Sequence, residues 1–182
     1  MSRRVLVAGV GNIFFGDDGF GVEVARRLAS RDLPEGVAVT DFGIRGVHLA
    51  YELLDGYDTF ILVDLSPRGD PPGTIYVIEP ELDDPECDAA FQEAVREGES
   101  ALIDAHGMQP AALFAMVKAL GGTLERVLIV GCEPADLGEG MDLSEPVEAA
   151  VDEAVRVVLS LIEEEVESGN ASGQKAKTGK EG

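Results

Sequence analysis

Four side chains with the chemistry to hold a metal ion or move a proton follow or border the apolar segments of this chain. They are Asp18, Asp41, Asp64 and His106. Two carboxylates and an imidazole form an open ligand set that suits a divalent transition metal. A metal held in this way can polarise a carbonyl group or activate a water molecule. No short signature such as HExxH is present, so the residues alone indicate only a metal site.

The first of these carboxylates stands in a glycine-rich turn between an apolar segment and a predicted helix. This order is typical of dinucleotide-binding folds, in which the turn cradles a pyrophosphate. Here Phe14 replaces the third glycine, Asp17 and Asp18 would repel a phosphate, and Asp41 lies beyond the roughly 20 residues expected for a ribose ligand. The turn therefore favours a cation, and a dinucleotide-binding domain is the weaker alternative.

Each candidate also has a structural interpretation. Asp18 could cap the helix, Asp41 could close a turn before Gly43, and His106 could be a helix-start or core residue. Asp64 could cap a turn. A carboxylate directly after four apolar residues nevertheless costs free energy to bury unless it is hydrated, paired with a cation or bound to a metal. The convergence of separate segments on one place favours the functional interpretation.

Two further residues receive structural assignments. We expect His48 at the surface of a short helix or in its packing. Cys132 at a strand end is expected to be a buried small hydrophobe, because no base adjoins it in the sequence.

The elements that must position these residues follow from the hydrophobic pattern. Predicted strands span 4–10, 37–42, 59–63, 74–78 and 126–130, and predicted helices span 18–30, 46–54, 107–120 and 145–166, the last capped by Ser144. The acidic segment 79–99 is expected at the surface, with a helical piece over 89–96.

This order predicts an α/β fold: a single-domain, open, twisted and mostly parallel sheet of about five strands with helices on both faces. The Pro- and Gly-rich segment 64–73 is too short for a helical crossover, so the following strand is expected to be antiparallel at the edge. Parallel strands end at one edge, where such folds bind ligands. The predicted domain covers 1–166, and 167–182 is predicted to be a disordered tail.

Composition restricts the function further. The chain has 182 residues, 45% of them hydrophobic, and a net charge of −21, which argues against nucleic acid and anionic membranes as partners. Cys87 and Cys132 are too few and too distant for a disulfide framework. No apolar run reaches the roughly 18 residues of a membrane span, and no signal-peptide cleavage site is evident. We expect a cytoplasmic monomer.

Several motifs together resemble the maturation endopeptidases of nickel-iron hydrogenases over residues 4–165. They are Gly9-Val10-Gly11-Asn12-Ile13, Gly16-Asp17-Asp18-Gly19-Phe20-Gly21, Phe60-Ile61-Leu62-Val63-Asp64, His106 and Gly131-Cys132-Glu133-Pro134. The resemblance implies this α/β fold. It also implies removal of a C-terminal peptide from the hydrogenase large-subunit precursor after nickel insertion.

The resemblance maps the family's nickel-recognising carboxylates and histidine onto Asp18, Asp64 and His106. The family carries Glu or Asp at the first of these positions. Its Asp-Gly-Gly-Thr-x-Gly-like segment corresponds to Asp41-Phe42-Gly43-Ile44-Arg45-Gly46, where Phe42 and Ile44 depart from the pattern. We expect this departure to affect which precursor is accepted.

The hypothesis is therefore a nickel-dependent endopeptidase, of metallo or aspartyl type, that activates a hydrogenase. Nickel arrives with the substrate and is not a resident cofactor. Asp41 is expected to orient water or bind substrate backbone, and Gly43 and Gly46 to let the substrate chain approach closely. The alternative from another class is a nickel or hydrogenase-subunit chaperone that binds at the same site without cleavage.

Overall fold

The computed structural model describes residues 3–82 and 110–177, with the isolated positions Pro85, Ala89, Gln92 and Arg96; of residues 170–177 it describes the backbone alone. The described elements are β1 (Val5–Val10), a 3-10 helix η1 (Gly16–Gly19), α1 (Phe20–Ala29), β2 (Val37–Gly43), α2 (Gly46–Leu53), β3 (Thr59–Leu65), β4 (Ile75–Ile78), α5 (Pro110–Ala119), β5 (Arg126–Cys132) and α6 (Glu145–Lys177).

The described strands form one five-stranded sheet in the order β2-β1-β3-β5-β4. β1 pairs in parallel with β2 and β3, and β3 pairs in parallel with β5. β4 pairs with β5 in the antiparallel direction, which confirms the predicted edge strand. The predicted α/β class and sheet are therefore confirmed.

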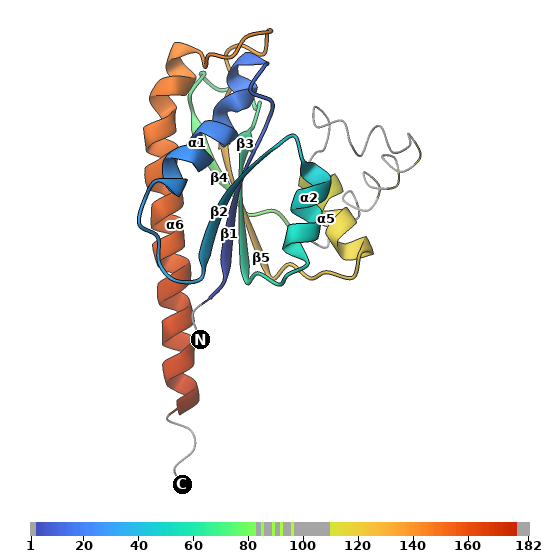
Figure 1. Cartoon of the computed structure of the whole chain (residues 1–182), viewed down its shortest axis with the longest axis vertical. Helices are drawn as coiled ribbons and strands as arrows, with labels where there is room; N and C mark the ends of the chain where they lie inside the picture. The colour runs from blue at the N-terminus through green and yellow to red at the C-terminus, as the bar shows by residue number, and fades with distance from the viewer. Residues whose placement is uncertain are drawn as a thin grey trace.

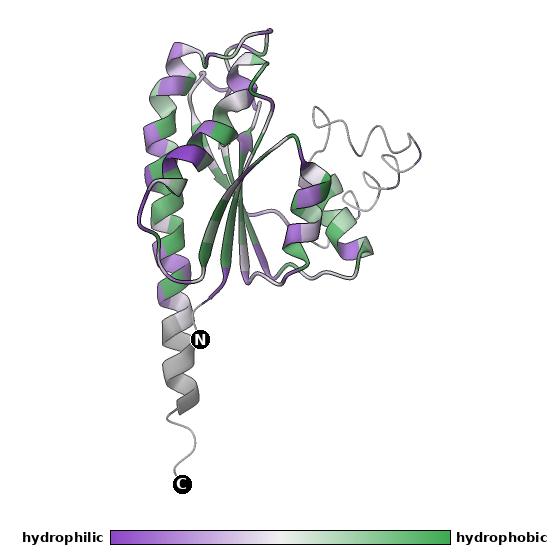
Figure 2. Cartoon of the chain, in the orientation of Figure 1, coloured by the Kyte–Doolittle hydropathy of each residue, from purple (hydrophilic) through white to green (hydrophobic). Residues whose placement is uncertain are grey.

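Helices cover both faces of this sheet (Figure 1). α1 and α6 lie on one face, and their side chains form a core with alternate residues of β1 and β3, such as Val7 and Val63. α2 and α5 lie on the other face, over the intervening residues such as Leu6 and Leu62. Figure 2 shows the central strands as the most hydrophobic part of the chain, as expected for strands covered on both sides.

Two glycines allow α1 to begin very close to the sheet. A Cβ atom at Gly9 would lie 2.1 Å from the Gly21 carbonyl oxygen. A Cβ atom at Gly21 would lie 2.2 Å from the Val63 carbonyl oxygen. The start of α1 therefore sits directly on the carboxyl ends of β1 and β3, and η1 with its two aspartates is held above the same edge.

Charged contacts also join α1 to α6 on the face of the sheet that these two helices share. Arg27 of α1 forms ion pairs with Glu23 at 2.9 Å, Glu148 at 2.6 Å and Asp152 at 2.9 Å. Helix α6 thus contacts α1 through both apolar and ionic groups.

Element boundaries differ from the predictions in several places. β3 continues to Leu65 and β5 to Cys132, because pairing between Asp64 and Gly131 and between Leu65 and Cys132 extends the ladder. Asp64 is therefore inside a strand and does not end it. β2 also continues past Asp41 to Gly43, with a register irregularity opposite Val10. The 3-10 turn η1 occupies the predicted start of the first helix.

Helix α6 extends to Lys177, beyond the end predicted near Val166. The helix still contacts the domain past that point, since a Cβ atom at Gly169 would lie 2.9 Å from the Cγ atom of Arg3. Residues 178–182 of the predicted tail lie outside the described residues, as does most of the segment 79–99. None of the described helices is both long and apolar enough to cross a membrane.

Candidate active site at the carboxyl edge of the sheet

Asp18 lies in η1, directly above the carboxyl end of β1. Its side chain is half-buried, and its Oδ2 atom accepts a hydrogen bond of 2.8 Å from the backbone N–H of Asn12. Gly11 allows η1 to pack against the turn after β1, because a Cβ atom at Gly11 would lie 1.8 Å from the Asp18 carbonyl oxygen. The turn that resembles a phosphate-binding loop is thus filled by a carboxylate of the chain itself.

Asp64 is the second carboxylate of the site and is held near the end of β3. It is half-buried, and its Oδ1 atom accepts a hydrogen bond of 2.7 Å from the N–H of Leu65. Burial raises the pKa of Asp64 to about 7, the Leu65 N–H opposes this shift, and the negative charge of Asp18 raises the pKa further. The structure therefore brings Asp18 and Asp64 within electrostatic reach of each other.

Asp17, next to Asp18, is fully buried and has a different set of contacts. Its Oδ2 atom accepts hydrogen bonds from the N–H groups of Ala135 and Asp136, both at 2.8 Å, and from the Ser144 hydroxyl at 2.9 Å. Its Oδ1 atom accepts the Ser144 N–H at 2.7 Å. Ser144 therefore donates its hydroxyl to Asp17, where the sequence predicted a cap for α6.

These hydrogen bonds control the charge of Asp17. Burial by itself would raise its pKa, but the donors from Asp136, Ser144 and Ala135 hold the pKa below its ordinary value. Asp17 is thus an ionised, buried group that fastens the loop 133–144 to η1.

Asp41 lies on the opposite side of the sheet from Asp64. It belongs to the same alternation as Val37 and Val39, which pack with α1, whereas Asp64 follows the alternation of Phe60 and Leu62. The Oδ2 atom of Asp41 is 3.5 Å from Nε of Arg26 on α1. This geometry favours an ion pair over the predicted role in orienting water, which stays a prediction.

The two glycines predicted to admit substrate differ in their backbone. Gly43 has φ +52°, which favours glycine, and its carbonyl oxygen accepts a 3.0 Å hydrogen bond from the N–H of Gly11. Gly46 begins α2 and does not have a positive φ. Gly43 is therefore required by the bulge in β2, which places the following Ile44 in solvent with 52% of its surface exposed.

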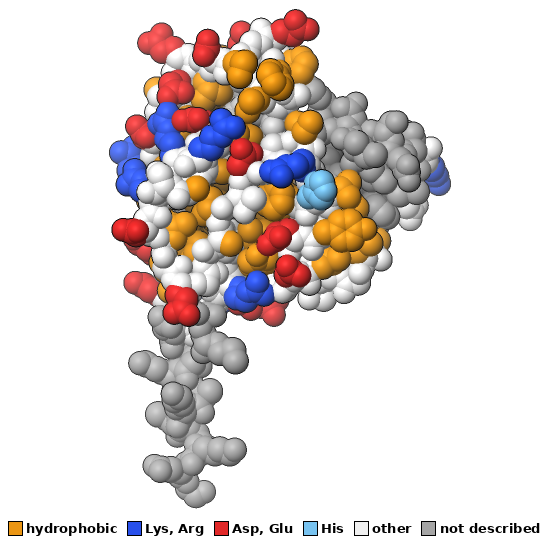
Figure 3. Space-filling model, viewed as in Figure 1, with side chains coloured by type: hydrophobic (Ala, Val, Ile, Leu, Met, Phe, Trp, Pro, Cys, Tyr) orange, Lys and Arg blue, Asp and Glu red, His pale blue; other side chains and the backbone are white. Residues whose placement is uncertain are grey.

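The third predicted metal ligand, His106, lies outside the described residues, as does Cys87. Within the ranges that are described, no group of three or more His, Cys, Asp or Glu side chains is arranged to hold a metal ion. His48 is exposed on α2, as predicted (Figure 3). Cys132 is fully buried, which raises the pKa of its thiol to about 12 and confirms that it is not an activated nucleophile.

Glu133 stabilises the loop that follows β3. Its carboxylate accepts the N–H groups of Arg68 at 2.8 Å and Gly69 at 3.1 Å, and the hydroxyl of Tyr76 at 2.8 Å. The hydrogen bond from Arg68 contributes most to holding the pKa of Glu133 below its ordinary value. The acid in the Gly131-Cys132-Glu133-Pro134 stretch thus has a structural role in this fold.

The sequence profile of a family described as "Hydrogenase maturation protease" matches residues 22–161. The chain belongs to the hydrogenase maturation protease family. It is therefore a peptidase, and the predicted family is confirmed. The matched range includes Asp41, Asp64 and His106 and begins after Asp18.

Individual relatives of this hydrogenase maturation protease support the same family assignment. A putative hydrogenase maturation protease from Methanocaldococcus jannaschii is 33% identical, and the match covers 88% of this chain and 97% of the relative. The crystal structure of hydrogenase 2 maturation peptidase from Thaumarchaeota archaeon SCGC_AB-539-E09 is 35% identical with a TM-score of 0.64, covering 88% and 98% of the two chains. The hydrogenase maturating endopeptidase HybD from Escherichia coli is 27% identical with a TM-score of 0.67, covering 88% and 93%.

The burial of three carboxylates was not predicted from the sequence: Asp17, Glu133 and Glu165. The Asp17-Asp18 pair gives no sign of which side chain is buried. Glu165 had a detectable signal, because it follows Val158 and Ile162 at the spacing of one helix face. Glu165 is 1% exposed and accepts hydrogen bonds from Arg3 at 3.1 Å, from the Thr59 hydroxyl at 2.5 Å and from Arg126.

Proposed function

We propose that this chain is the endopeptidase that removes a C-terminal peptide from the nickel-loaded precursor of a nickel-iron hydrogenase large subunit. Membership of the hydrogenase maturation protease family supports the processing of a hydrogenase precursor. The observation that carries the nickel-dependent part is the pair formed by Asp18 and Asp64, two half-buried carboxylates whose charges interact at the carboxyl edge.

Nickel is part of the substrate in this proposal. Asp18 and Asp64 supply oxygen ligands, and His106 supplies an imidazole nitrogen, so that three protein ligands leave positions for the precursor's own ligands. The buried carboxyl of Asp64, whose pKa is raised to about 7, gains a cation that offsets the cost of its negative charge. Binding of the nickel-loaded precursor is then coupled to release of a proton from Asp64.

In this proposal, cleavage depends on nickel being held beside the peptide bond that is cut. Nickel held by Asp18 and Asp64 would polarise the carbonyl of that bond or activate a water molecule that attacks it. A precursor without nickel lacks the group that these carboxylates bind, so it is not positioned for cleavage. Selection for the loaded precursor and orientation of its backbone are thus performed by the same residues.

The test is the intact mass of the source's own large-subunit precursor after incubation with this protein, with and without nickel loading. We expect nickel-dependent loss of a C-terminal peptide, and no loss with Asp64→Ala or His106→Ala. Asp32→Ala is the matched control, since Asp32 is an exposed acid after α1 at the other end of the sheet.

The outcomes separate the alternatives. Full processing by Asp64→Ala or His106→Ala would remove that residue from the mechanism. An unchanged precursor mass together with a stable nickel-dependent complex would support a chaperone that binds without cleavage. No cleavage and no complex with any large-subunit precursor of the source would overturn the proposed function.

A further inference from the structure

Three large apolar side chains project into solvent from two loops at the carboxyl edge. Phe14 belongs to the loop after β1, and Leu137 and Met141 belong to the loop after β5. Their exposed fractions are 59%, 53% and 65%. We call these three residues the apolar rim. Phe, Leu and Met are usually buried in proteins, so several on adjoining loops indicate a surface that another molecule covers.

The two loops of the apolar rim are joined by their backbones. The N–H of Gly140 donates to the carbonyl of Phe14 at 2.9 Å, and the N–H of Gly16 donates to the carbonyl of Gly140 at 2.8 Å. Asp17 adds the buried hydrogen bonds to Ala135, Asp136 and Ser144. The rim is therefore already ordered before any partner binds, which lowers the entropy lost on binding.

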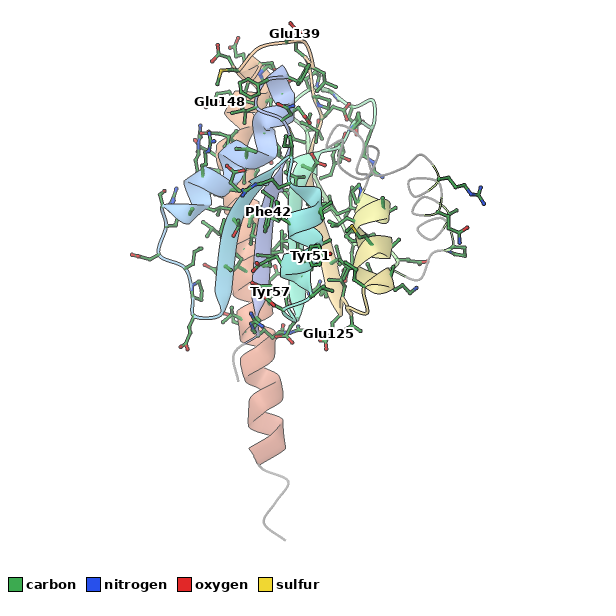
Figure 4. The ribbon with its side chains drawn as sticks, turned by 45° about the vertical axis from the view of Figure 1, so that its right-hand side comes forward. Phe42, Tyr51, Tyr57, Glu125, Glu139 and Glu148 are labelled. Atoms are coloured by element: carbon green, nitrogen blue, oxygen red, sulfur yellow. The ribbon has the colours of Figure 1, made fainter. Side chains whose placement is uncertain are left out.

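Acidic side chains border the apolar rim. Residues 133–145 contain five Asp or Glu and no Lys or Arg, and Asp136, Glu139 and Asp142 among them are exposed. No ion pair among the described residues involves Glu139 or Asp142. Figure 3 shows hydrophobic side chains beside acidic ones at the top of the molecule, and Figure 4 places Glu139 at the outermost point of this loop.

The apolar rim is also continuous with the carboxylate site. The N–H of Phe14 donates to Oδ1 of Asn12 at 3.0 Å, and the N–H of Asn12 donates to Oδ2 of Asp18 at 2.8 Å. Phe14 is thus linked to Asp18 through a single intervening residue. A polypeptide whose metal ion is bound by Asp18 would therefore contact the apolar rim with residues that lie close to its metal site.

We propose that the apolar rim and its acidic border form the docking surface for the hydrogenase large-subunit precursor. The proposal rests on the proposed function and deepens it by assigning the part of the protein that binds the substrate away from the metal. The segment that docks carries apolar side chains next to lysines or arginines. Burial of Phe14, Leu137 and Met141 supplies affinity, and the unpaired acids supply specificity and faster association.

Charge argues against the other occupants of this surface. A second copy of this chain would bring another acidic loop against Glu139 and Asp142, and the net charge of −21 adds long-range repulsion. An anionic lipid surface would be repelled for the same reason. A basic and apolar protein segment satisfies both parts of the surface.

The first experiment compares kcat and KM for processing of the nickel-loaded precursor by wild type and by Phe14→Ser/Leu137→Ser/Met141→Ser. We expect KM to rise about tenfold or more with kcat within about twofold, because the variant loses binding and keeps the carboxylate site. Leu120→Ser is the matched control, since Leu120 is 42% exposed and follows α5 at the opposite edge of the sheet. This control should keep the wild-type KM.

The second experiment tests the acidic border with Glu139→Lys/Asp142→Lys. KM should rise, and its increase with salt, present in wild type, should disappear or reverse in the variant. Asp32→Lys, which changes a distant exposed acid, should leave both the KM and its salt dependence at the wild-type value.

The results are decisive in each direction. If wild type processes the precursor and the rim variant does so with the same KM, the docking surface is wrong and the proposed function stands. If wild type processes no precursor, the proposed function is wrong and the docking surface falls with it. A wild-type dimer in sedimentation that the rim variant dissociates would assign the rim to self-association and overturn the proposal.

Discussion

Asp17 and Asp18 are adjacent in the chain, but their carboxylates accept hydrogen bonds from different segments, Asp17 from the loop 133–144 and Asp18 from Asn12. Asp17 is fully buried and accepts hydrogen bonds from the loop 133–144, whereas Asp18 is half-buried and lies within electrostatic reach of Asp64. One aspartate therefore fixes the turn, and its neighbour can be presented to a substrate because the turn is fixed.

Because the two aspartates have different roles, replacing each of them by asparagine should have different effects. Asp17→Asn should lower the free energy of unfolding by on the order of 2–4 kcal/mol, because the amide cannot accept all four hydrogen bonds in a buried site. Asp18→Asn should cost much less stability but should abolish processing. Chemical denaturation and precursor cleavage, measured on both variants, check this; equal stability of the two variants would contradict it.

The pH dependence of Asp17 has a definite sign. Its pKa in the folded state lies below the ordinary value, so its contribution to stability is present above the unfolded pKa of about 4 and is lost as the pH falls below it. The stability difference between wild type and Asp17→Asn should therefore shrink on acidification. Denaturation curves between about pH 3 and pH 7 measure this difference.

Asp64 should show the opposite dependence. Because burial raises its folded pKa to about 7, ionisation is harder in the folded protein, and stability falls as the pH rises from about 4 through 7. Asp64→Asn removes this cost. Without nickel we expect its melting temperature to exceed that of wild type by about 2–4 °C at neutral pH, a gain of about 1 kcal/mol, with no difference near pH 4.

That stabilised variant should also be inactive, since it lacks a proposed nickel ligand. A melting temperature for Asp64→Asn equal to or below that of wild type at pH 8 would contradict the placement of Asp64 in a poorly hydrated site. Differential scanning calorimetry at pH 4, 6 and 8 is sufficient.

Glu165 provides a contrast at the amino edge of the sheet. Glu165→Gln should destabilise the protein by about 2–4 kcal/mol, because Arg3 and Arg126 lose the buried carboxylate that they share. Its kcat and KM, measured well below the melting temperature, should stay at the wild-type values. A changed KM would show that the two edges of the sheet are coupled.

Gly21→Ala tests the close approach of α1 to the sheet. The new Cβ atom would lie 2.2 Å from the Val63 carbonyl and 2.4 Å from the Val10 carbonyl, so the helix must shift outward. We expect a loss of about 1–3 kcal/mol in stability and a raised KM, because η1 with Asp18 moves with α1. Thermal denaturation and precursor titration measure the two effects, and unchanged values would rule out the tight packing.

The fold could be predicted to a large extent because its signals are local. The apolar run at 59–63 predicted a doubly covered strand, and the short Pro- and Gly-rich segment 64–73 predicted the antiparallel direction of β4. The ends of β3 and β5 could not be predicted, because residues 64–65 and 131–132 extend those strands only through pairing with each other. Such pairing depends on tertiary contact and leaves no local pattern.

The site could be predicted only in part. The position of Asp64 directly after an apolar run indicated an unusual carboxylate, and its raised pKa agrees. The direction of Asp41 could not be inferred, because the face that a strand residue occupies depends on register, and the ion pair with Arg26 requires α1 to lie on that side. The burial of Asp17 depends equally on contacts with residues more than a hundred positions away.

Helix α6 has one further consequence for how the molecule can change shape. Ser144, just before its first residue, is held by Asp17 at the carboxyl edge, and Glu165 ties the helix to Arg3 and Arg126 at the amino edge. Helix α6 is thus attached at both edges of the sheet and braces it, so α1, α6 and the sheet should move as one stiff body. Conformational changes on binding of a polypeptide should therefore occur on the side of α2, where Ile44 and Arg45 are exposed.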